Sequence, residues 1–527
     1  MQEKAKKITA LICAAALTMA LCGCGRTVVT GDGTTEGKND GGSVSAAAAS
    51  DGKFSLFYDG SYSLNPMKAT DDNNQLVCGL IYENMVTVNN AFTLQAGVVT
   101  KWESTDGKTW TFTVDPGAHT FSNGSSVTAK DVAYSLRCAI NNQRFENRFS
   151  GRIAAIEAVD DAKFTVTLNK AESQFPMLMT VPVIQYNTVQ NTYPIGSGPY
   201  TYAQDHQSLT ANTHYAGTDG LPVGAVYLQK YTSVDDFITK FEDSTVDLVP
   251  NDPSASTNLG FGSSNETRSF NTTNLHFIGF NLQSKFFQSR ELQYAFTFAF
   301  DRKYMANTLM QGNALAACAP INPASPLYNK YFDQTYSYDL EQCKTVLAQL
   351  GVEDYDDDGM MEYMIGGAPI ELDINFAVCS DSGVKVSMAE KFALDMKGLG
   401  ITVTVKTLNY SDYKAALTAG TFDMYYGEVR LSPDFDLSCL LASGGSANYS
   451  RETDSENAAL IDAYLAAGDD SRRQACDDMC SYIAQTAAII PICFEKHQII
   501  THKGVITGMT VNQNEPLCSF AKWKINI

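Results

Sequence analysis

The chain has 527 residues, of which 44% are hydrophobic and 18% charged, and its formal net charge is −20 at pH 7. This acidity excludes a nucleic-acid partner, because the sequence offers no basic stripe to meet phosphates. The roughly 475 residues after position 52 are too many for one hydrophobic core, so we expect at least two lobes.

The first 23 residues have the pattern of a secretory signal peptide. Three lysines within residues 4–7 precede an apolar run over 11–21, which is too short to cross ~30 Å of hydrocarbon. Gly23 then precedes Cys24, and this string resembles a bacterial lipobox. The resemblance implies cleavage before Cys24 and diacylation of its thiol. A plain secretory signal is the alternative.

A stretch rich in Gly, Ser, Thr and Ala follows over residues 24–52 and has no aromatic residue. Such a composition cannot bury enough surface to fold, so we expect a flexible linker that starts at the lipidated Cys24. No later segment is long and apolar enough for a second membrane anchor. The body is therefore expected on the extracytoplasmic face of the cell membrane, held there by lipid alone.

The first half of the body alternates strands and helices. Alternating apolar residues predict strands over 53–58, 110–114 and 163–168. Thr128 with Asp131 three residues later is a capping pattern that opens a predicted helix over 132–140.

The second half continues in the same way. A buried strand is predicted over 274–282, and the nearly all-apolar segment 290–300 predicts a central helix. Asp339 and Gln342 cap a helix that ends at Gly351. The next predicted elements alternate helix and strand: helix 385–399, strand 401–405, helix 411–419 and strand 422–426. This alternation indicates α/β lobes with partly parallel sheets.

Residues that could carry chemistry are sparse. The ten cysteines beyond Cys24 often lie in apolar patterns, for example at 135–140, so we expect mostly free thiols. The six histidines are scattered without ligand spacing, and no nucleophile motif is present. We therefore expect no enzymatic activity, no cofactor and no dedicated metal site.

One acidic turn leaves an alternative open. Asp354, Asp356 and Asp358, followed by Gly359, match the first half of a calcium-binding EF-hand loop. The position of the bidentate Glu is instead Ile365. We favour a structural turn, with calcium as the alternative.

Several sequence blocks occur in the order of a known family. They are Ser63-Leu-Asn-Pro66, Ile81-Tyr-Glu-Asn-Met-Val86, Asp106-Gly-Lys-Thr-Trp-Thr-Phe-Thr-Val-Asp-Pro-Gly117, Phe121-Ser-Asn-Gly124, Val127-Thr-Ala-Lys-Asp-Val132, Gly196-Ser-Gly-Pro-Tyr200, Ala295-Phe-Thr-Phe-Ala-Phe-Asp-Arg302 and Tyr338-Asp-Leu-Glu341. Each block is weak alone, but their number, order and spacing are specific. From about Phe54 to Ile527 the chain resembles the extracytoplasmic solute-binding proteins of peptide and nickel ABC importers.

The resemblance implies an α/β periplasmic-binding-protein fold, type II-like and of cluster C, with two lobes joined by two crossing segments. A solute binds in the cleft between the lobes, which close on it by a hinge motion. The implied parts are lobe 1 (53–68, 191–274 and 491–527), an insertion in lobe 1 (69–190) and lobe 2 (275–490).

The segment 424–436 is the implied ligand-reading strand. In peptide-binding relatives an Asp after the Gly of this strand anchors the peptide amine, and that position here is Leu431. The dipeptide type also uses an Arg just before the helix that here starts at 385, but the loop 378–382 has none. A dipeptide clamped at both ends is therefore not supported.

The remaining candidates come from the same strand and from nearby aromatic residues. A bidentate Arg430 would hold a carboxylate, although Arg430 and Glu428 could instead form an internal ion pair. Asp434 is a further candidate, although it aligns with a downstream turn. Aromatic side chains line clefts at low entropic cost, and the candidates are Tyr62, Tyr425, Tyr426 and Tyr449.

These observations predict a monomeric, non-enzymatic receptor that delivers its solute to the transmembrane subunits of an ABC permease. An oligopeptide is the favoured solute, because backbone hydrogen bonds can hold a long peptide without an anchor at each end. A sensor lipoprotein, or a binder of a metal chelate or a sugar, is the alternative. An exported hydrolase would need a nucleophile, a base and an orienting group, and the sequence offers no such trio.

Overall fold

The computed structural model describes residues 52–255 and 264–527. The expected signal peptide, the lipidated Cys24 and nearly all of the linker lie outside the described residues. Among the helices that are described, none combines the length and the apolar character needed to cross a membrane.

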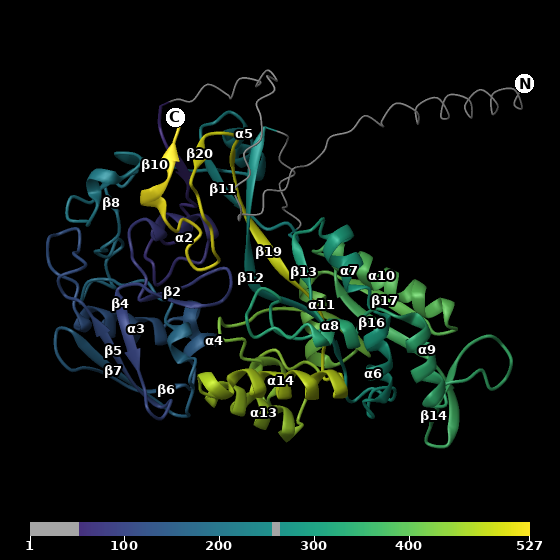
Figure 1. Ribbon diagram of the computed structural model, residues 1–527. Helices are drawn as coiled ribbons and strands as arrows, with labels where there is room; N and C mark the ends of the chain where they lie inside the picture. Colours follow the sequence, from purple (N-terminus) through teal and green to yellow (C-terminus); the bar gives the residue numbers. More distant parts are fainter. Residues whose placement is uncertain (1–51, 256–263) are drawn as a thin grey trace, which may run out of the picture. The chain divides into compact units, whose positions relative to one another are not determined.

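One sheet of eleven strands runs through the described part of the body (Figure 1). Its order is β17-β16-β18-β12-β19-β11-β1-β10-β9-β8, with β13 beside β19. The strands are β1 Ser55–Phe57, β8 Tyr200–Tyr202, β9 Ser208–Ala211, β10 Ala225–Gln229, β11 Leu248–Asn251, β12 Asn265–Phe280, β13 Ala314–Ala316, β16 Asp373–Cys379, β17 Thr402–Leu408, β18 Met424–Arg430 and β19 Ile490–His502.

The long strands β12 and β19 link the two lobes. They pair antiparallel from Asn265↔His502 to Ile278↔Ile490. At one end β19 also pairs with β11 of lobe 1, and at the other end β12 pairs with β18 of lobe 2. The predicted strand 274–282 is therefore only the lobe 2 part of a longer strand.

Lobe 1 and its insertion share one hydrophobic core. The insertion contains an antiparallel sheet in the order β4-β5-β7-β6, and α3 begins with the predicted Thr128–Asp131 capping box. The elements are β2 Val86–Val88, β3 Leu94–Ala96, β4 Val99–Glu103, β5 Thr109–Val114, β6 Ile153–Ala158, β7 Lys163–Leu168, α2 Asp72–Gly79, α3 Ala129–Ile140, α4 Glu146–Phe149, α5 Val234–Glu242, and the 3-10 turns Gln143–Phe145, Phe175–Leu178 and Thr218–Gly220. Close to the chain end lie β20 Ile506–Thr507, β21 Lys524–Ile525 and the 3-10 turn Phe520–Lys522.

Lobe 2 packs helices against β16, β17 and β18, which pair in parallel around β16. The predicted helix 290–300 ends early, as α6 followed by a 3-10 turn, because buried Arg302 donates hydrogen bonds to the carbonyls of Thr297 and Phe300. The elements are α6 Glu291–Phe296, the 3-10 turn Thr297–Ala299, α7 Arg302–Tyr304, the π-turn Met305–Leu309, α8 Tyr331–Thr335, α9 Leu340–Gln349, β14 Glu362–Ile365, β15 Ala368–Glu371, α10 Gly383–Gly398, α11 Tyr410–Ala419, α12 Ser438–Leu441, α13 Ser455–Ala466 and α14 Asp469–Thr486.

Two main hydrophobic cores form within the described residues, and the lobe boundaries implied by the resemblance stay a prediction. One core gathers side chains from 275–494 and the other gathers side chains from 54–270 and 499–523. Val88, Phe92 and Met177 of the insertion pack into the lobe 2 core. The insertion therefore contacts both lobes.

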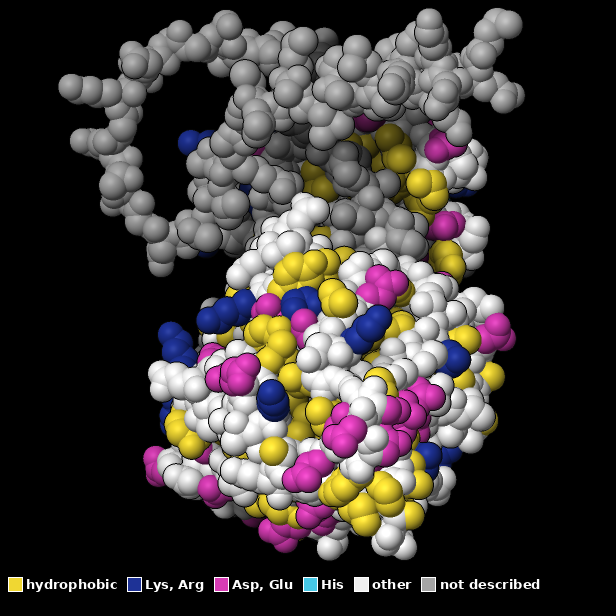
Figure 2. Space-filling view, turned by 90° about the vertical axis from the view of Figure 1, so that its right-hand side faces the viewer, with side chains coloured by type: hydrophobic (Ala, Val, Ile, Leu, Met, Phe, Trp, Pro, Cys, Tyr) yellow, Lys and Arg dark blue, Asp and Glu magenta, His cyan; other side chains and the backbone are white. Residues whose placement is uncertain are grey.

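The cysteines agree with the expectation of mostly free thiols. The ten cysteines beyond Cys24 are free thiols, and burial raises the pKa of Cys78 and of Cys343 to about 12. Figure 2 shows Asp and Glu side chains gathered in several groups on one face of the molecule, with Lys and Arg between them.

Candidate functional site

A cleft of ≈ 2210 Å³ is lined by residues of lobe 1, the insertion and lobe 2. Its walls include the start of α2, the α4 region, the end of β11, the end of β18 and the middle of β19. Because β12 and β19 pass between the lobes here, side chains on these strands lie at the floor of the cleft.

The end of β18 supplies part of one wall, as the resemblance implies. Glu428, Arg430 and Leu431 line the cleft. Glu428 forms an ion pair with Lys385 on α10, and this attraction raises the pKa of Lys385 although burial opposes the shift. The internal Glu428–Arg430 pair considered from the sequence does not form. Leu431 is buried, and its amide donates to the Thr273 carbonyl at 3.0 Å.

Arg430 belongs to a group of three arginines that the sequence analysis missed. Arg144 donates to the Pro66 carbonyl and to Gln75 Oε1, and Arg148 donates to the Leu178 carbonyl and to Thr180. Arg430 makes no hydrogen bond or ion pair through its side chain to any described residue. The arginine cluster, defined as Arg144, Arg148 and Arg430, lines the cleft.

The arginine cluster carries positive charge that Asp72 and Asp434 offset only at longer range, among the side chains that the structure describes. Among the described residues, none of the three forms an ion pair with a carboxylate. Burial, together with the charges of Arg430 and Arg144, lowers the pKa of Arg148 to about 9. Burial and the Arg430 charge lower the pKa of Arg144 to about 10. Guanidinium groups that repel one another would each be stabilised by an anion in the cleft.

Another part of the cleft wall is acidic. Glu83 accepts a hydrogen bond from His119 Nδ1 at 3.0 Å, which raises the pKa of His119 against the effect of burial. Burial and the Glu83 charge raise the pKa of Glu515, whose Oε1 accepts from Asn84 Nδ2 at 2.9 Å. These carboxyl groups are suited to a positively charged group on a solute.

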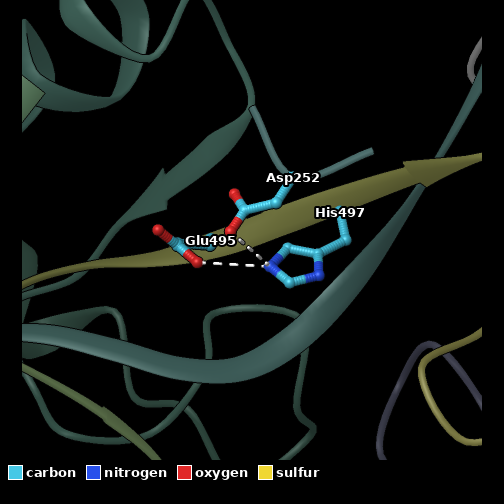
Figure 3. Close-up of side chains that lie close together, drawn as sticks. All are labelled: Asp252, Glu495 and His497. Atoms are coloured by element: carbon cyan, nitrogen blue, oxygen red, sulfur yellow. Dashed lines mark hydrogen bonds and ion pairs between the residues drawn. The ribbon is translucent and has the colours of Figure 1, made fainter. Parts of the chain in front are cut away.

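At the floor of the cleft, Glu495 lies between two histidines. Glu495 Oε1 lies 2.6 Å from His276 Nε2, and Glu495 Oε2 lies 3.3 Å from His497 Nε2. Burial alone would raise the pKa of Glu495. Contact with His276 and His497 instead holds this pKa well below its usual range. Figure 3 shows Asp252 beside Glu495, with both carboxylates facing the same ring nitrogen of His497.

The aromatic candidates divide between the cleft and the core. Tyr62 is 53% exposed and lines the cleft, as does half-buried Tyr449, which accepts a hydrogen bond from Lys414. Tyr425 and Tyr426 are each 2% exposed and pack in the lobe 2 core, so they do not line the cleft. Tyr425 is buried because its ring lies over Gly279 on β12, where a Cβ atom would lie 2.3 Å from the ring.

Asp434 is a structural residue rather than part of the cleft wall. Its side chain is 1% exposed and pairs with Arg152 of the insertion at 3.7 Å. Arg152 also contacts Glu172 at 2.7 Å and Asp436. This group of charges, the Arg152 network, joins the insertion to lobe 2.

The acidic turn brings its carboxylates together with one more acid. Asp354, Asp356, Asp358 and Glu362 place one oxygen each within 4.8 Å of one another. Asp354 accepts hydrogen bonds from the amides of Asp358 and Gly359, which is the bonding of a structural turn. Both the turn and the calcium alternatives stay open.

Two sequence signals could have found the residues that were missed. Arg144 and Arg148 are four residues apart, a spacing that places side chains on one face of a helix. Glu495 and His497 are two residues apart, a spacing that places side chains on one face of a strand.

Comparisons with known proteins agree with this architecture. The family model for bacterial extracellular solute-binding proteins, family 5 (middle part), matches residues 93–450. The chain is 23% identical to heme-binding protein A of Haemophilus influenzae over 429 residues, covering 72% of this chain and 75% of that protein. It is 22% identical to the nickel-binding periplasmic protein of Escherichia coli over 472 residues, covering 83% and 88%. A solved periplasmic murein tripeptide-binding protein, in its unliganded open form, superposes with a TM-score of 0.73 at 18% identity, covering 91% of this chain and 99% of that one.

Proposed function

Because the chain belongs to the family 5 bacterial extracellular solute-binding proteins, which serve ABC importers and are not enzymes, we propose that it captures peptides and delivers them to a membrane permease. The size of the cleft supports a peptide longer than two residues, since ≈ 2210 Å³ exceeds the roughly 300–1,000 Å³ of ordinary small-molecule pockets. The murein tripeptide-binding protein shares the fold.

The observation that carries this proposal is the arginine cluster. Arg430 forms no side-chain hydrogen bond or ion pair with a described residue, although Asp72 attracts it at longer range, and Arg144 and Arg148 use neutral oxygens as acceptors. A carboxylate from the solute would neutralise this charge through paired N–H···O bonds. The solute that fits best is therefore a peptide with an acidic end or acidic side chains, and the carboxyl groups of Glu83 and Glu515 would receive its amine.

We also propose where the protein acts. A diacylated Cys24 would tether the body, as a monomer, to the outer face of the cell membrane through the linker. A captured peptide would then be released at the permease when the lobes open.

Native mass spectrometry of the soluble body (residues 25–527), purified without denaturation, tests the peptide proposal. We expect co-purifying masses that resolve into peptides enriched in Asp and Glu. A chain that stays empty, and whose melting temperature no peptide of a mixed library raises, would contradict it.

An anionic metal chelate is the second candidate, favoured by the same arginine cluster, because multidentate chelators present several carboxylates. The nickel-binding relative agrees with this candidate. In the same spectra, a bound mass with the isotope pattern of a metal would favour the chelate over a peptide.

A further inference from the structure

Three possible metal-ligand atoms meet at the floor of the cleft (Figure 3). Glu495 and His497 lie two residues apart on β19, so their side chains share one face of the strand. Asp252 directly follows β11, which pairs with β19 through Asn251↔Gln498. The strand register therefore brings a residue of the β11–β12 connection against two residues of β19.

The spacing of these atoms suits a small divalent ion. His497 Nε2 lies 3.3 Å from Glu495 Oε2 and 3.8 Å from Asp252 Oδ2. All three atoms lie within 4.8 Å of one another. A tetrahedral ion bound at about 2.0–2.2 Å places its ligand atoms about 3.3–3.6 Å apart. The two distances to His497 lie in or close to this range, and side-chain rotation would bring the two carboxylate oxygens, at most 4.8 Å apart, into it.

Each carboxylate is oriented by hydrogen bonds to its other oxygen. Asp252 Oδ1 accepts from the Ser254 amide at 2.8 Å and from its hydroxyl at 2.9 Å. Glu495 Oε1 bonds to His276, whose Nδ1 lies 3.2 Å from the Tyr426 hydroxyl. This leaves Asp252 Oδ2 and Glu495 Oε2 directed at His497, with Asn274 as a further donor to Glu495 Oε2 at 3.1 Å. Outer hydrogen bonds of this kind fix the ligands of metal sites.

We propose that Asp252 Oδ2, Glu495 Oε2 and His497 Nε2 bind one divalent transition-metal ion, such as Zn²⁺ or Ni²⁺. One imidazole with two carboxylates favours such ions over Ca²⁺ and Mg²⁺, which select oxygen ligands. On binding, the ion takes the place of the proton between His497 and Glu495, and that proton passes to solvent.

The open coordination positions of the ion face the cleft, because Asp252 and His497 line it whereas Glu495 is buried behind them. A water molecule, or a donor atom of a solute, would complete the coordination. A second nearby group, His276 with Glu428 and Glu495, suits an ion less well, because Glu428 already pairs with Lys385. The proposed site does not depend on which solute the cleft captures.

Calorimetric titration of the intact, chelator-treated chain with Zn²⁺ and Ni²⁺ tests the site. We expect one ion per chain, and at least a tenfold to hundredfold weaker binding in His497→Asn and in Asp252→Asn. His214→Asn, at an exposed histidine, and Asp219→Asn, at an exposed aspartate outside the cleft, are matched controls that should bind as the wild type does. Thermal unfolding of each metal-free variant checks that it is folded.

If His497→Asn fails to fold, Asp252→Asn and the visible absorption spectrum of Co²⁺ bound to the wild type keep the test decisive. Failure of the wild type to take up an ion, or uptake that survives both substitutions, would overturn the site. Metal uptake by a chain that ignores every peptide would support the site and count against the peptide proposal. Peptide capture without metal uptake would support the peptide proposal and count against the metal site.

Discussion

Arg430 illustrates how a single side chain can favour function over stability. Its charge lowers the pKa of Arg148, so the two repel each other in the empty cleft. For Arg430→Gln we expect an empty protein at least as stable as the wild type. Loss of a charge-assisted bond should weaken binding of an acidic peptide by about 1.5–3 kcal/mol, or roughly tenfold to a hundredfold in Kd. Fluorescence titration and thermal unfolding measure the two effects.

The control for Arg430→Gln is Arg473→Gln, at an exposed arginine outside the cleft, which should leave the peptide affinity unchanged. Equal affinities for the wild type and Arg430→Gln would show that Arg430 does not contact the solute.

His119 should make the stability of the fold depend on pH, with more stability at low pH than at high pH. Its hydrogen bond to Glu83 raises its pKa above the ordinary 6.5, so the folded state binds the proton more tightly than the unfolded state. The stabilisation is fully present below about pH 6.5 and is lost as the pH rises through the raised pKa. His119→Gln should therefore cost more stability at pH 5.5 than at pH 8.5, as measured by urea unfolding. Glu83→Gln should remove the same pH dependence, and a cost that is independent of pH would contradict this account.

At the residue scale, the candidates at the end of β18, Glu428 and Arg430, line the cleft, whereas Tyr425 and Tyr426 on its buried part do not. Tyr425 was a reasonable cleft candidate by type and position. Its burial depends on Gly279, which is 146 positions away in the chain and opposite it only once β12 pairs with β18. No local pattern contains that pairing.

Between β12 and β18, an aromatic residue on one strand lies opposite a glycine on the other at two positions. Phe277 lies opposite Gly427, and Gly279 lies opposite Tyr425. A Cβ atom at Gly427 would lie 2.4 Å from the buried ring of Phe277, so Gly427→Ala should destabilise the fold by about 1–3 kcal/mol in urea unfolding. Gly398→Ala, where a Cβ meets no atom within 4 Å, should be neutral or stabilising by up to about 1 kcal/mol. If the two substitutions changed the free energy of unfolding equally, steric fit at Gly427 would not be the cause.

The Arg152 network stabilises the contact between β6 and the segment after β18. Arg152→Met would leave the carboxylates of Glu172, Asp434 and Asp436 without their cation, and only 1% of the Asp434 side chain is exposed. We expect a loss of about 3–5 kcal/mol in the free energy of unfolding. Lys170 and Asp462 also join the insertion to lobe 2, but their side chains are 70% and 52% exposed. Lys170→Met should therefore cost less than about 1 kcal/mol. Similar losses for the two variants would contradict this reading.

Most elements were predictable because hydrophobic periodicity and capping residues act locally. Helix α3 and its capping box, the strands β5 and β7, and helix α11 lie at or within one residue of their expected positions, apart from the first residues of α3. The predictions were less accurate where a distant segment decides the outcome, as when pairing with β19 extends β12 beyond the predicted strand. The floor of the cleft could not be predicted for the same reason, because β11 and β19 pair there from positions about 250 residues apart.

At the scale of the whole molecule, two lobes joined by two strands should close on a solute by a hinge motion. Adding a peptide that raises the melting temperature should therefore reduce the radius of gyration measured by small-angle X-ray scattering. The surface charge should keep the protein monomeric during the measurement. An unchanged radius on saturation would indicate that capture occurs without closure.

The linkage of the lobes through β12 and β19 also determines when, during synthesis of the chain, the lobes can finish folding. The first strand, β1, lies beside β11, and β11 needs β19 as its other neighbour. Phe54 also packs against Phe520, with ring centroids 5.7 Å apart. A ribosome adding about 5–20 residues per second needs roughly 10–40 s to pass from the end of β12 to the start of β19. Throughout that interval the nascent chain lacks the strand that completes its central sheet, so neither lobe can finish folding before translation of the chain is nearly complete.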